Sequence, residues 1–157
     1  MKRSVRKGVS FGLISGIITT LWLIIGLHSG THSQIMIIGW ILVIAIADAL
    51  SDALGIHVSE EAENKHSTKE VWESTIATFL TKFIFALTFI IPILFFELST
   101  AIIVSIVRGI FWVAAFSYYV AKLGNVNPFK VVSEHVLIAI IVIIITHYVG
   151  DWIAMFI

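Results

Sequence analysis

The sequence predicts an all-α integral membrane protein with five transmembrane helices. The composition, the length of the apolar runs and the placement of the basic residues support this prediction. Of the 157 residues, 59% are hydrophobic and 13% are charged, whereas soluble domains average about 45–50% apolar and about 25% charged residues. The formal net charge is zero and cysteine is absent, which argues against a nucleic-acid partner and excludes disulfides and thiolate metal sites.

Five apolar runs are long enough to cross a bilayer, because a hydrocarbon core of about 30 Å needs about 20 residues per helix. They cover residues 9–27, 35–58, 74–96, 99–121 and 136–157. We expect one transmembrane domain over 1–157, with a charged segment at 59–73 between the second and third spans. The first run is too long for a cleavable signal, so the first helix is expected to remain in the protein.

The basic residues set the expected orientation. Lysine and arginine occur before the first span, within 59–73 and in the fourth connection, but the connections at 28–34 and 97–99 contain none. Because cytoplasmic loops are enriched in these residues, we expect a cytoplasmic amino terminus and a carboxyl terminus outside the cell or in a lumen.

Small residues recur at four-residue spacing in the first two spans. The first span has Gly8, Gly12 and Gly16, and the second has one stripe of Ala45, Ala49 and Ala53 and another of Ala47, Ser51 and Gly55. Small side chains let membrane helices approach closely. We therefore expect the first two spans to pack tightly together and to face a second subunit of a homodimer. The alternative is that small residues are simply common in membrane helices.

The second span carries two acids, Asp48 and Asp52, four residues apart and therefore on one face. At about 1.5 Å per residue, Asp52 lies about 9 Å and Asp48 about 15 Å from the cytoplasmic end, and Lys82 of the third span about 12 Å. These depths favour a pair between Lys82 and Asp52. Arg108 falls near mid-membrane, where Asp151 or Asp48 is its expected partner.

Two interpretations of these intramembrane charges remain open. An ion at the bilayer centre costs at least about 2.5–3.5 kcal/mol, so such residues usually form pairs or line a hydrated path. Neutralised pairs would indicate a non-transporting scaffold or subunit. An excess of acid over Lys82 would instead indicate a cation path, because neighbouring acids can exchange a proton for a metal ion. Since no intramembrane protease or hydrolase motif occurs, an enzyme is not expected.

Histidines suggest further positions along such a path. His147 and Asp151 are four residues apart and could bind metal or relay protons, although a membrane histidine often only bonds a neighbouring helix. His28 and His32 could bind a departing ion weakly or belong to an ordinary loop.

The sequence predicts a capped beginning and a bend in the third span. Ser67 and Glu70 fit a capping box at its beginning. Pro92 removes one backbone hydrogen bond and leaves the Thr88 carbonyl free, which predicts a bend.

The charged segment 59–73 contains two pairs of glutamates three residues apart. These are Glu60 with Glu63 and Glu70 with Glu73, and His66 lies between the pairs. Such pairs can present oxygens to one cation, and a histidine would favour iron, manganese or zinc. An ordinary solvated run of charges is the alternative.

Two stretches resemble the vacuolar iron transporter family, whose members also have five helices. They are Phe-Gly-Leu-Ile-Ser-Gly at 11–16 and Ala-Asp-Ala-Leu-Ser-Asp-Ala-Leu-Gly-Ile-His-Val-Ser-Glu-Glu at 47–61, with support from 99–105 and 127–130. The likeness covers nearly the whole chain and is most specific in the second span. It implies a dimeric, proton-coupled exporter of ferrous iron, often also of manganese. The path would run between the first two helices of both subunits, above a glutamate-rich cytoplasmic region.

The chain departs from the family pattern at three places. Phe11 stands where an acid is typical, Asp52 stands where a methionine is common, and the cytoplasmic insertion is reduced to 59–73. Replacing methionine by a carboxylate shifts the expected site toward harder oxygen ligands.

The resulting expectation is proton-coupled export of Fe²⁺ or Mn²⁺, with the metal as substrate and no permanently bound cofactor. The membrane would be the cell membrane of a prokaryote or a vacuole-like membrane of a eukaryote. The expected metal ligands are Asp48, Asp52, Glu60, Glu63, His66, Glu70 and Glu73. The expected ion-path or proton-relay residues are Lys82, Arg108, His147 and Asp151.

Overall fold

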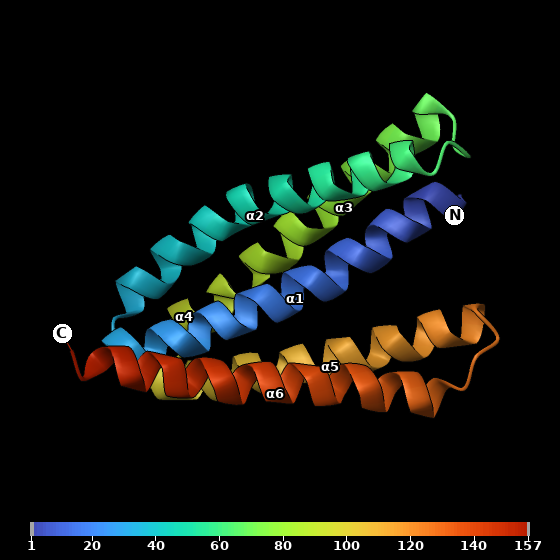
Figure 1. Ribbon diagram of the computed structural model, residues 1–157. Helices are drawn as coiled ribbons and strands as arrows, with labels where there is room; N and C mark the ends of the chain where they lie inside the picture. The colour runs from blue at the N-terminus through green and yellow to red at the C-terminus, as the bar shows by residue number, and fades with distance from the viewer. Residues whose placement is uncertain (1, 157) are drawn as a thin grey trace.

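The computed structural model describes residues 2–156, and within that range it contains helices and no strands. The elements are α1 (Arg3–Thr31), α2 (Gln34–Ala62), α3 (Thr68–Thr88), α4 (Ile90–Phe95), α5 (Leu98–Leu123) and α6 (Pro128–Ala154) (Figure 1). Together α3 and α4 form one span, so five segments are long and apolar enough to cross a membrane. The predicted fold class is confirmed, although the last residue of the predicted fifth span, Ile157, lies outside the described range.

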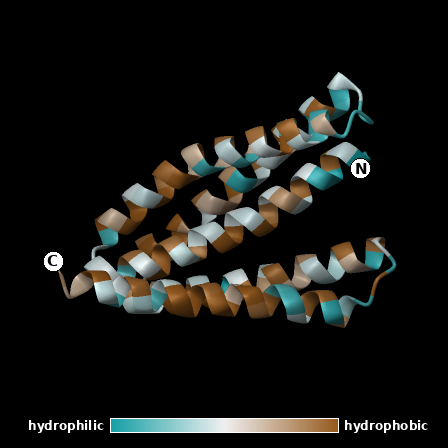
Figure 2. Ribbon diagram, in the orientation of Figure 1, coloured by the Kyte–Doolittle hydropathy of each residue, from teal (hydrophilic) through white to brown (hydrophobic). Residues whose placement is uncertain are grey.

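Most helices continue beyond the apolar runs that predict them. The second helix extends to Ala62, which carries its acidic end past the span, and α6 begins at Pro128. Asn127 caps α6, since its side chain accepts a hydrogen bond from the Phe129 amide at 3.0 Å. Hydropathy follows the same plan: the middle of the bundle is largely hydrophobic and hydrophilic residues gather toward the helix ends (Figure 2).

The start of α3 is capped as predicted. The Ser67 side chain accepts from the Glu70 amide, and the Glu70 carboxylate accepts from the Ser67 amide at 2.9 Å. This reciprocal pair satisfies two amides that a helix beginning would leave unbonded.

The third span breaks where Pro92 predicts it. Helix α3 ends at Thr88 and α4 begins at Ile90. The Thr88 carbonyl accepts a hydrogen bond from Arg108 Nη1 at 2.7 Å, and Arg108 also donates to the Thr88 hydroxyl. The predicted acidic partner of Arg108 is therefore wrong: among the described residues, no carboxylate forms an ion pair with it. The backbone oxygen freed by the proline takes that place.

The glycines of the first span contact a different helix from the predicted one. A Cβ atom on Gly12 would lie 2.5 Å from the Thr78 carbonyl oxygen, and one on Gly8 would overlap the Ser74 carbonyl. Both contacts are on α3, so the prediction that this stripe packs against the second span is wrong. Close approach at these glycines makes α1 and α3 the central pair.

The two small-residue stripes of α2 differ in burial. Ala45, Ala49 and Ala53 are buried, whereas Ala47, Ser51 and Gly55 are exposed. A Cβ atom on Gly55 would meet nothing within 4 Å. One stripe thus packs within the bundle and the other lies on its surface.

The last two helices join the bundle mainly at the end far from the amino terminus. There Gly150 of α6 lies so close to α1 that a Cβ would overlap the Gly26 carbonyl. Toward the other end, α5 and α6 diverge from α1 (Figure 1). The two termini lie at opposite ends of the bundle, as an odd number of spans requires.

Candidate functional site

Two aspartates and a lysine form a cluster between α2, α3 and α1. Lys82 Nζ lies 2.6 Å from Asp48 Oδ2 and also contacts Asp52 Oδ2. Ser15 of α1 completes the group: its hydroxyl lies 2.9 Å from Lys82 Nζ and donates to Asp52 at 2.5 Å. We call Ser15, Asp48, Asp52 and Lys82 the intramembrane cluster. The predicted pair of Lys82 with Asp52 is confirmed, and Asp48 shares the same ammonium group.

The cation of the cluster is more deeply buried than its acids. The Lys82 side chain is 1% exposed, whereas those of Asp48 and Asp52 are 32% and 22% exposed. Asp52 accepts hydrogen bonds from Lys82 and Ser15, but Asp48 Oδ2 is held by the ion pair alone, because the contact lacks hydrogen-bond geometry. Two carboxylates facing one ammonium carry a formal charge of −1, and Asp48 is the less firmly held acid.

A glycine gives Lys82 room to reach α2. A Cβ atom on Gly16 would lie 3.1 Å from Lys82 Cγ and 3.2 Å from its Cα atom. The aliphatic part of the lysine therefore packs directly against the α1 backbone. Sequence reasoning connected neither Gly16 nor Ser15 to this site, although Ser15 directly precedes Gly16 and lies three residues after Gly12.

A second charged group lies at the end of the bundle that carries the amino terminus. Lys7 contacts Glu60 Oε1 and lies 3.4 Å from Glu63 Oε1. His66 Nε2 lies 3.3 Å from Glu60 Oε2 and 3.4 Å from Glu63 Oε2. The Glu60 side chain is only 1% exposed. It lines a cavity of about 230 Å³ together with Lys7, Glu63, His66 and Arg3. We call Lys7, Glu60, Glu63 and His66 the terminal cluster.

The pKa of Glu63 is lowered below its ordinary value of 4.5. The hydrogen bond from Lys7 is the largest cause, followed by the charge of Lys7 and the hydrogen bond from His66. The carboxylate is therefore ionised at neutral pH, and a cation entering this group would compete with Lys7.

The other two glutamates of the segment 59–73 have separate partners. Glu70 is occupied by the cap at Ser67, although it lines the same cavity. Glu73 accepts from Lys2 at 2.5 Å and from Ser4 at 2.8 Å. The structure thus brings Glu60, Glu63 and His66 together but does not join all four predicted glutamates in one group.

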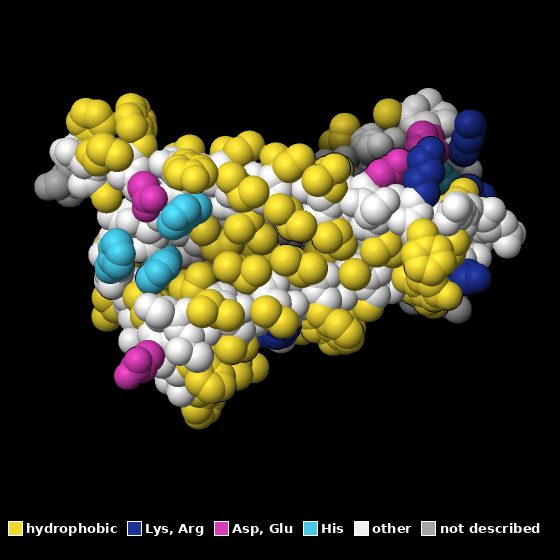
Figure 3. Space-filling view, turned by 90° about the horizontal axis from the view of Figure 1, so that it is seen from below, with side chains coloured by type: hydrophobic (Ala, Val, Ile, Leu, Met, Phe, Trp, Pro, Cys, Tyr) yellow, Lys and Arg dark blue, Asp and Glu magenta, His cyan; other side chains and the backbone are white. Residues whose placement is uncertain are grey.

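A third polar group lies at the opposite end of the bundle. The buried hydroxyl of Ser29 lies 2.8 Å from His147 Nδ1 and donates to Asp151. His147 Nε2 lies 3.4 Å from Asp151 Oδ2, and the rings of His28 and His32 are 5.2 Å apart. Histidine side chains gather at this end beside carboxylates (Figure 3). Sequence reasoning did not single out Ser29, because serine is common in membrane helices.

Over the described range, no three histidine or carboxylate side chains are placed so that they could hold one metal ion. Five of the seven predicted ligands instead form two groups, Asp48 and Asp52 around Lys82, and Glu60, Glu63 and His66 with Lys7, whereas Glu70 and Glu73 have separate partners. In a single chain, a metal ion that binds these acids would therefore have to displace the lysine that pairs with them.

Comparison with known proteins adds no assignment. Neither a scan against known protein families nor a search of curated proteins finds a match to this chain.

Proposed function

We propose that the protein exports a divalent metal ion, Fe²⁺ or Mn²⁺, from the cytoplasm in exchange for protons. The observation that carries this proposal is the sharing of one buried ammonium, that of Lys82, by two partly exposed carboxylates. Asp48 and Asp52 would bind the ion in transit, and Lys82 would serve as the counter-charge in its absence. The resemblance of the second span to metal exporters points the same way.

The need for a neutral group inside the bilayer links metal entry to proton release. With Lys82 protonated and both acids ionised, the cluster has a formal charge of −1, and a divalent ion would raise it to +1. If Lys82 then releases one proton, the metal and the two carboxylates form a neutral group. Because an uncompensated charge is costly inside a bilayer, this step favours exchange over simple addition.

The terminal cluster fits the task of recruiting the ion. Glu60 and Glu63 lie on and just beyond α2, the helix that carries Asp48 and Asp52. Eight residues, or about 12 Å of helix, separate Asp52 from Glu60. Lys7 pairs with two glutamates in the way that Lys82 pairs with two aspartates. The two acidic groups would therefore act in series along one helix.

The exposed stripe of α2 supports a homodimer. Ala47, Ser51 and Gly55 leave room for a second helix to approach, and the acids on the same helix remain partly exposed. A second copy would bring its own Asp48 and Asp52 close by. This arrangement would supply the ligands that one chain lacks.

Flux into liposomes tests the proposal. Purified protein would be reconstituted with a metal-sensitive dye and a pH-sensitive dye, and Mn²⁺ would be added under a proton gradient. We expect metal uptake with opposite proton movement for the wild type and neither for Asp52→Asn. Glu134→Gln removes an exposed acid of α6 and should leave both signals unchanged. Wild-type flux in Asp52→Asn would exclude Asp52 from the mechanism.

A passive membrane scaffold is the second candidate. Specific observations favour it: Lys82 contacts both aspartates, and Arg108 is bonded to Thr88. In a scaffold these contacts would only hold helices together. The wild-type protein would then show no metal flux at any pH, and simultaneous neutralisation of Asp48, Asp52 and Lys82 would preserve assembly. Flux above that of protein-free liposomes would exclude this candidate.

A further inference from the structure

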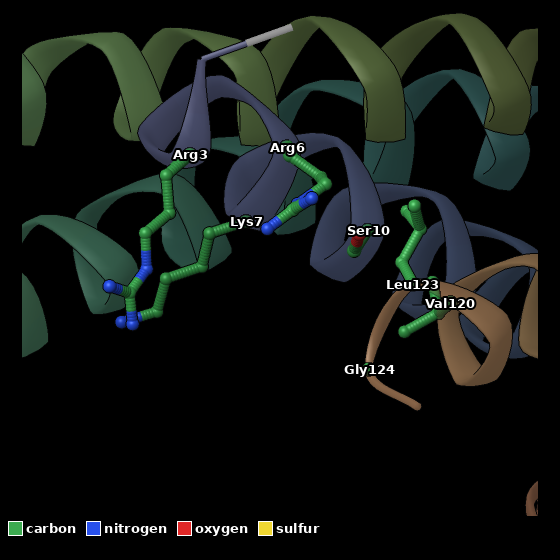
Figure 4. Close-up of a pocket in the computed structure, with 7 residues that line it drawn as sticks. All are labelled: Arg3, Arg6, Lys7, Ser10, Val120, Leu123 and Gly124. Carbon is green, nitrogen blue, oxygen red and sulfur yellow. The ribbon is translucent and has the colours of Figure 1, made fainter. Parts of the chain in front are cut away.

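A basic pocket lies between the first turns of α1 and the end of α5. Its volume is about 240 Å³. It is lined by Arg3, Arg6, Lys7, Ser10, Val120, Leu123 and Gly124 (Figure 4). Its lining residues come from α1 and α5, and α5 diverges from α1 toward this end of the bundle (Figure 1).

The α1 side of the pocket carries three basic side chains, of which Arg3 and Lys7 also line the neighbouring cavity of the terminal cluster. Arg3, Arg6, Lys7 and Ser10 share one helix face, because their spacing follows the helical repeat. Lys7 is engaged by Glu60 and Glu63, but Arg3 and Arg6 form no side-chain ion pair or hydrogen bond with any residue in 2–156. None of the lining residues is acidic. Two guanidinium groups thus remain available to an anion.

The opposite wall is apolar and belongs to a membrane-spanning helix. Val120 and Leu123 form this wall in the last turn of α5, and Gly124 is the C-cap of that helix. Nearby, the Lys122 ammonium lies 5.7 Å from the centre of the Tyr118 ring, and both side chains are exposed. Basic and aromatic residues at the end of a span are typical of the level of the lipid headgroups. The pocket therefore joins an anion-binding wall to a surface suited to hydrocarbon.

We propose that this pocket binds an anionic phospholipid. Arg3 and Arg6 would bind the headgroup phosphate, because guanidinium groups pair with phosphate oxygens through two parallel hydrogen bonds. Ser10 would contribute a further donor, and the acyl chains would lie against Val120 and Leu123. Basic pockets between transmembrane helices are suited to such headgroups.

The apolar wall distinguishes a lipid from a free phosphate ion. A soluble anion would use the two arginines and leave Val120 and Leu123 exposed to water or to other lipids. A phospholipid uses both walls at once, and it fills the space between the diverging helices. The proposed phosphate ligands, Arg3, Arg6 and Ser10, belong to neither cluster of the transport proposal, and only Lys7 is shared with the terminal cluster.

Native mass spectrometry of the detergent-solubilised full chain can test the proposal. Phosphatidylglycerol and phosphatidylcholine would be titrated separately. We expect phosphatidylglycerol to remain bound to the wild type and to bind about thirtyfold more weakly to Arg3→Gln/Arg6→Gln, as for the loss of two basic contacts at an anionic surface. Arg3→Lys/Arg6→Lys should recover part of the loss by restoring the charge.

The control variant Lys65→Gln/Lys69→Gln makes the same change in net charge at exposed positions of the same end of the bundle. We expect it to bind phosphatidylglycerol like the wild type. Equal binding to Arg3→Gln/Arg6→Gln and the wild type, or equal loss in the control, would overturn the proposal. Retention of phosphatidylcholine as strong as that of phosphatidylglycerol would also overturn it. So would displacement of the lipid by inorganic phosphate at an equal concentration, because it would indicate a site for a free anion.

Discussion

Replacing Lys82 by methionine gives the sharpest test of the intramembrane cluster. The change keeps an unbranched side chain in a position that is 1% exposed, and it leaves two carboxylates without their shared ammonium. Removing one partner of a buried ion pair typically destabilises a protein by about 3–5 kcal/mol. Because Asp48 and Asp52 are 32% and 22% exposed, solvent reduces that penalty, and we expect about 2–3 kcal/mol.

A double-mutant cycle isolates the contribution of the contact itself. It combines Lys82→Met with Asp52→Asn, and a second cycle uses Asp48→Asn in place of Asp52→Asn. We expect the Asp52 cycle to give about 1–2 kcal/mol of coupling. The Asp48 cycle should give less, because Lys82 donates a hydrogen bond to Asp52, whereas its contact with Asp48 is an ion pair without hydrogen-bond geometry.

Reversible unfolding in mixed micelles, monitored by circular dichroism, would measure the free energies of unfolding of these variants. Lys69→Met is the matched control, since Lys69 is exposed and has no ion pair among the described residues. It should change stability by less than about 0.5 kcal/mol. A Lys82→Met variant as stable as this control, or no coupling in either cycle, would refute the arrangement on which both candidate functions depend.

Four other substitutions test contacts elsewhere in the bundle. Gly12→Ala should lower the free energy of unfolding by about 1–3 kcal/mol, because its Cβ would lie 2.5 Å from a backbone oxygen of α3. Gly55→Ala is its control: within one chain its Cβ meets nothing within 4 Å, so it should stabilise α2 of the monomer by up to about 1 kcal/mol. Ser67→Ala should lower the free energy of unfolding by about 1 kcal/mol, because it removes the cap of α3. In the same unfolding assay we expect this loss to be smaller than that of Gly12→Ala. Glu63→Gln should be less stable than the wild type at neutral pH, where the lowered pKa of Glu63 favours folding. A carboxylate whose pKa is lower in the folded state stabilises that state at pH values above its unfolded pKa. The stability difference between Glu63→Gln and the wild type should therefore shrink as pH falls below about 4.5 and vanish below the folded-state pKa. A difference that does not change with pH would contradict this cause.

The five spans could be predicted because each depends on local composition alone. Runs of apolar residues are required by bilayer thickness, and the cap at Ser67 and the break near Pro92 are chemical consequences of residues adjacent in sequence. The helix ends were less predictable. Helix α6 begins well before its apolar run, because the Asn127 side chain caps it and Pro128 occupies its first turn.

Helix neighbours were the part that sequence periodicity could not provide. Four-residue spacing reveals that Gly8, Gly12 and Gly16 admit a close neighbour, but it contains no information on which helix that is. Depth along the span correctly paired Lys82 with Asp52, because a helix rises by a constant amount per residue. The same argument failed for Arg108. Its partner is a backbone carbonyl, a class of acceptor that a comparison of charged residues does not consider.

The charge of the intramembrane cluster connects the two candidate functions to the proposed dimer. In one chain, Asp48 and Asp52 retain contact with the surroundings, which moderates the cost of an excess negative charge. If the exposed stripe of α2 packs against a second copy, two such clusters, each with a formal charge of −1, approach one another in a region of low dielectric constant. Their repulsion would oppose the dimer unless cations enter the interface. Protons would suffice for a scaffold, whereas a divalent ion would both join the subunits and occupy the path. The excess acid therefore predicts cations at a dimer interface, which would be protons in a scaffold and a divalent ion in an exporter.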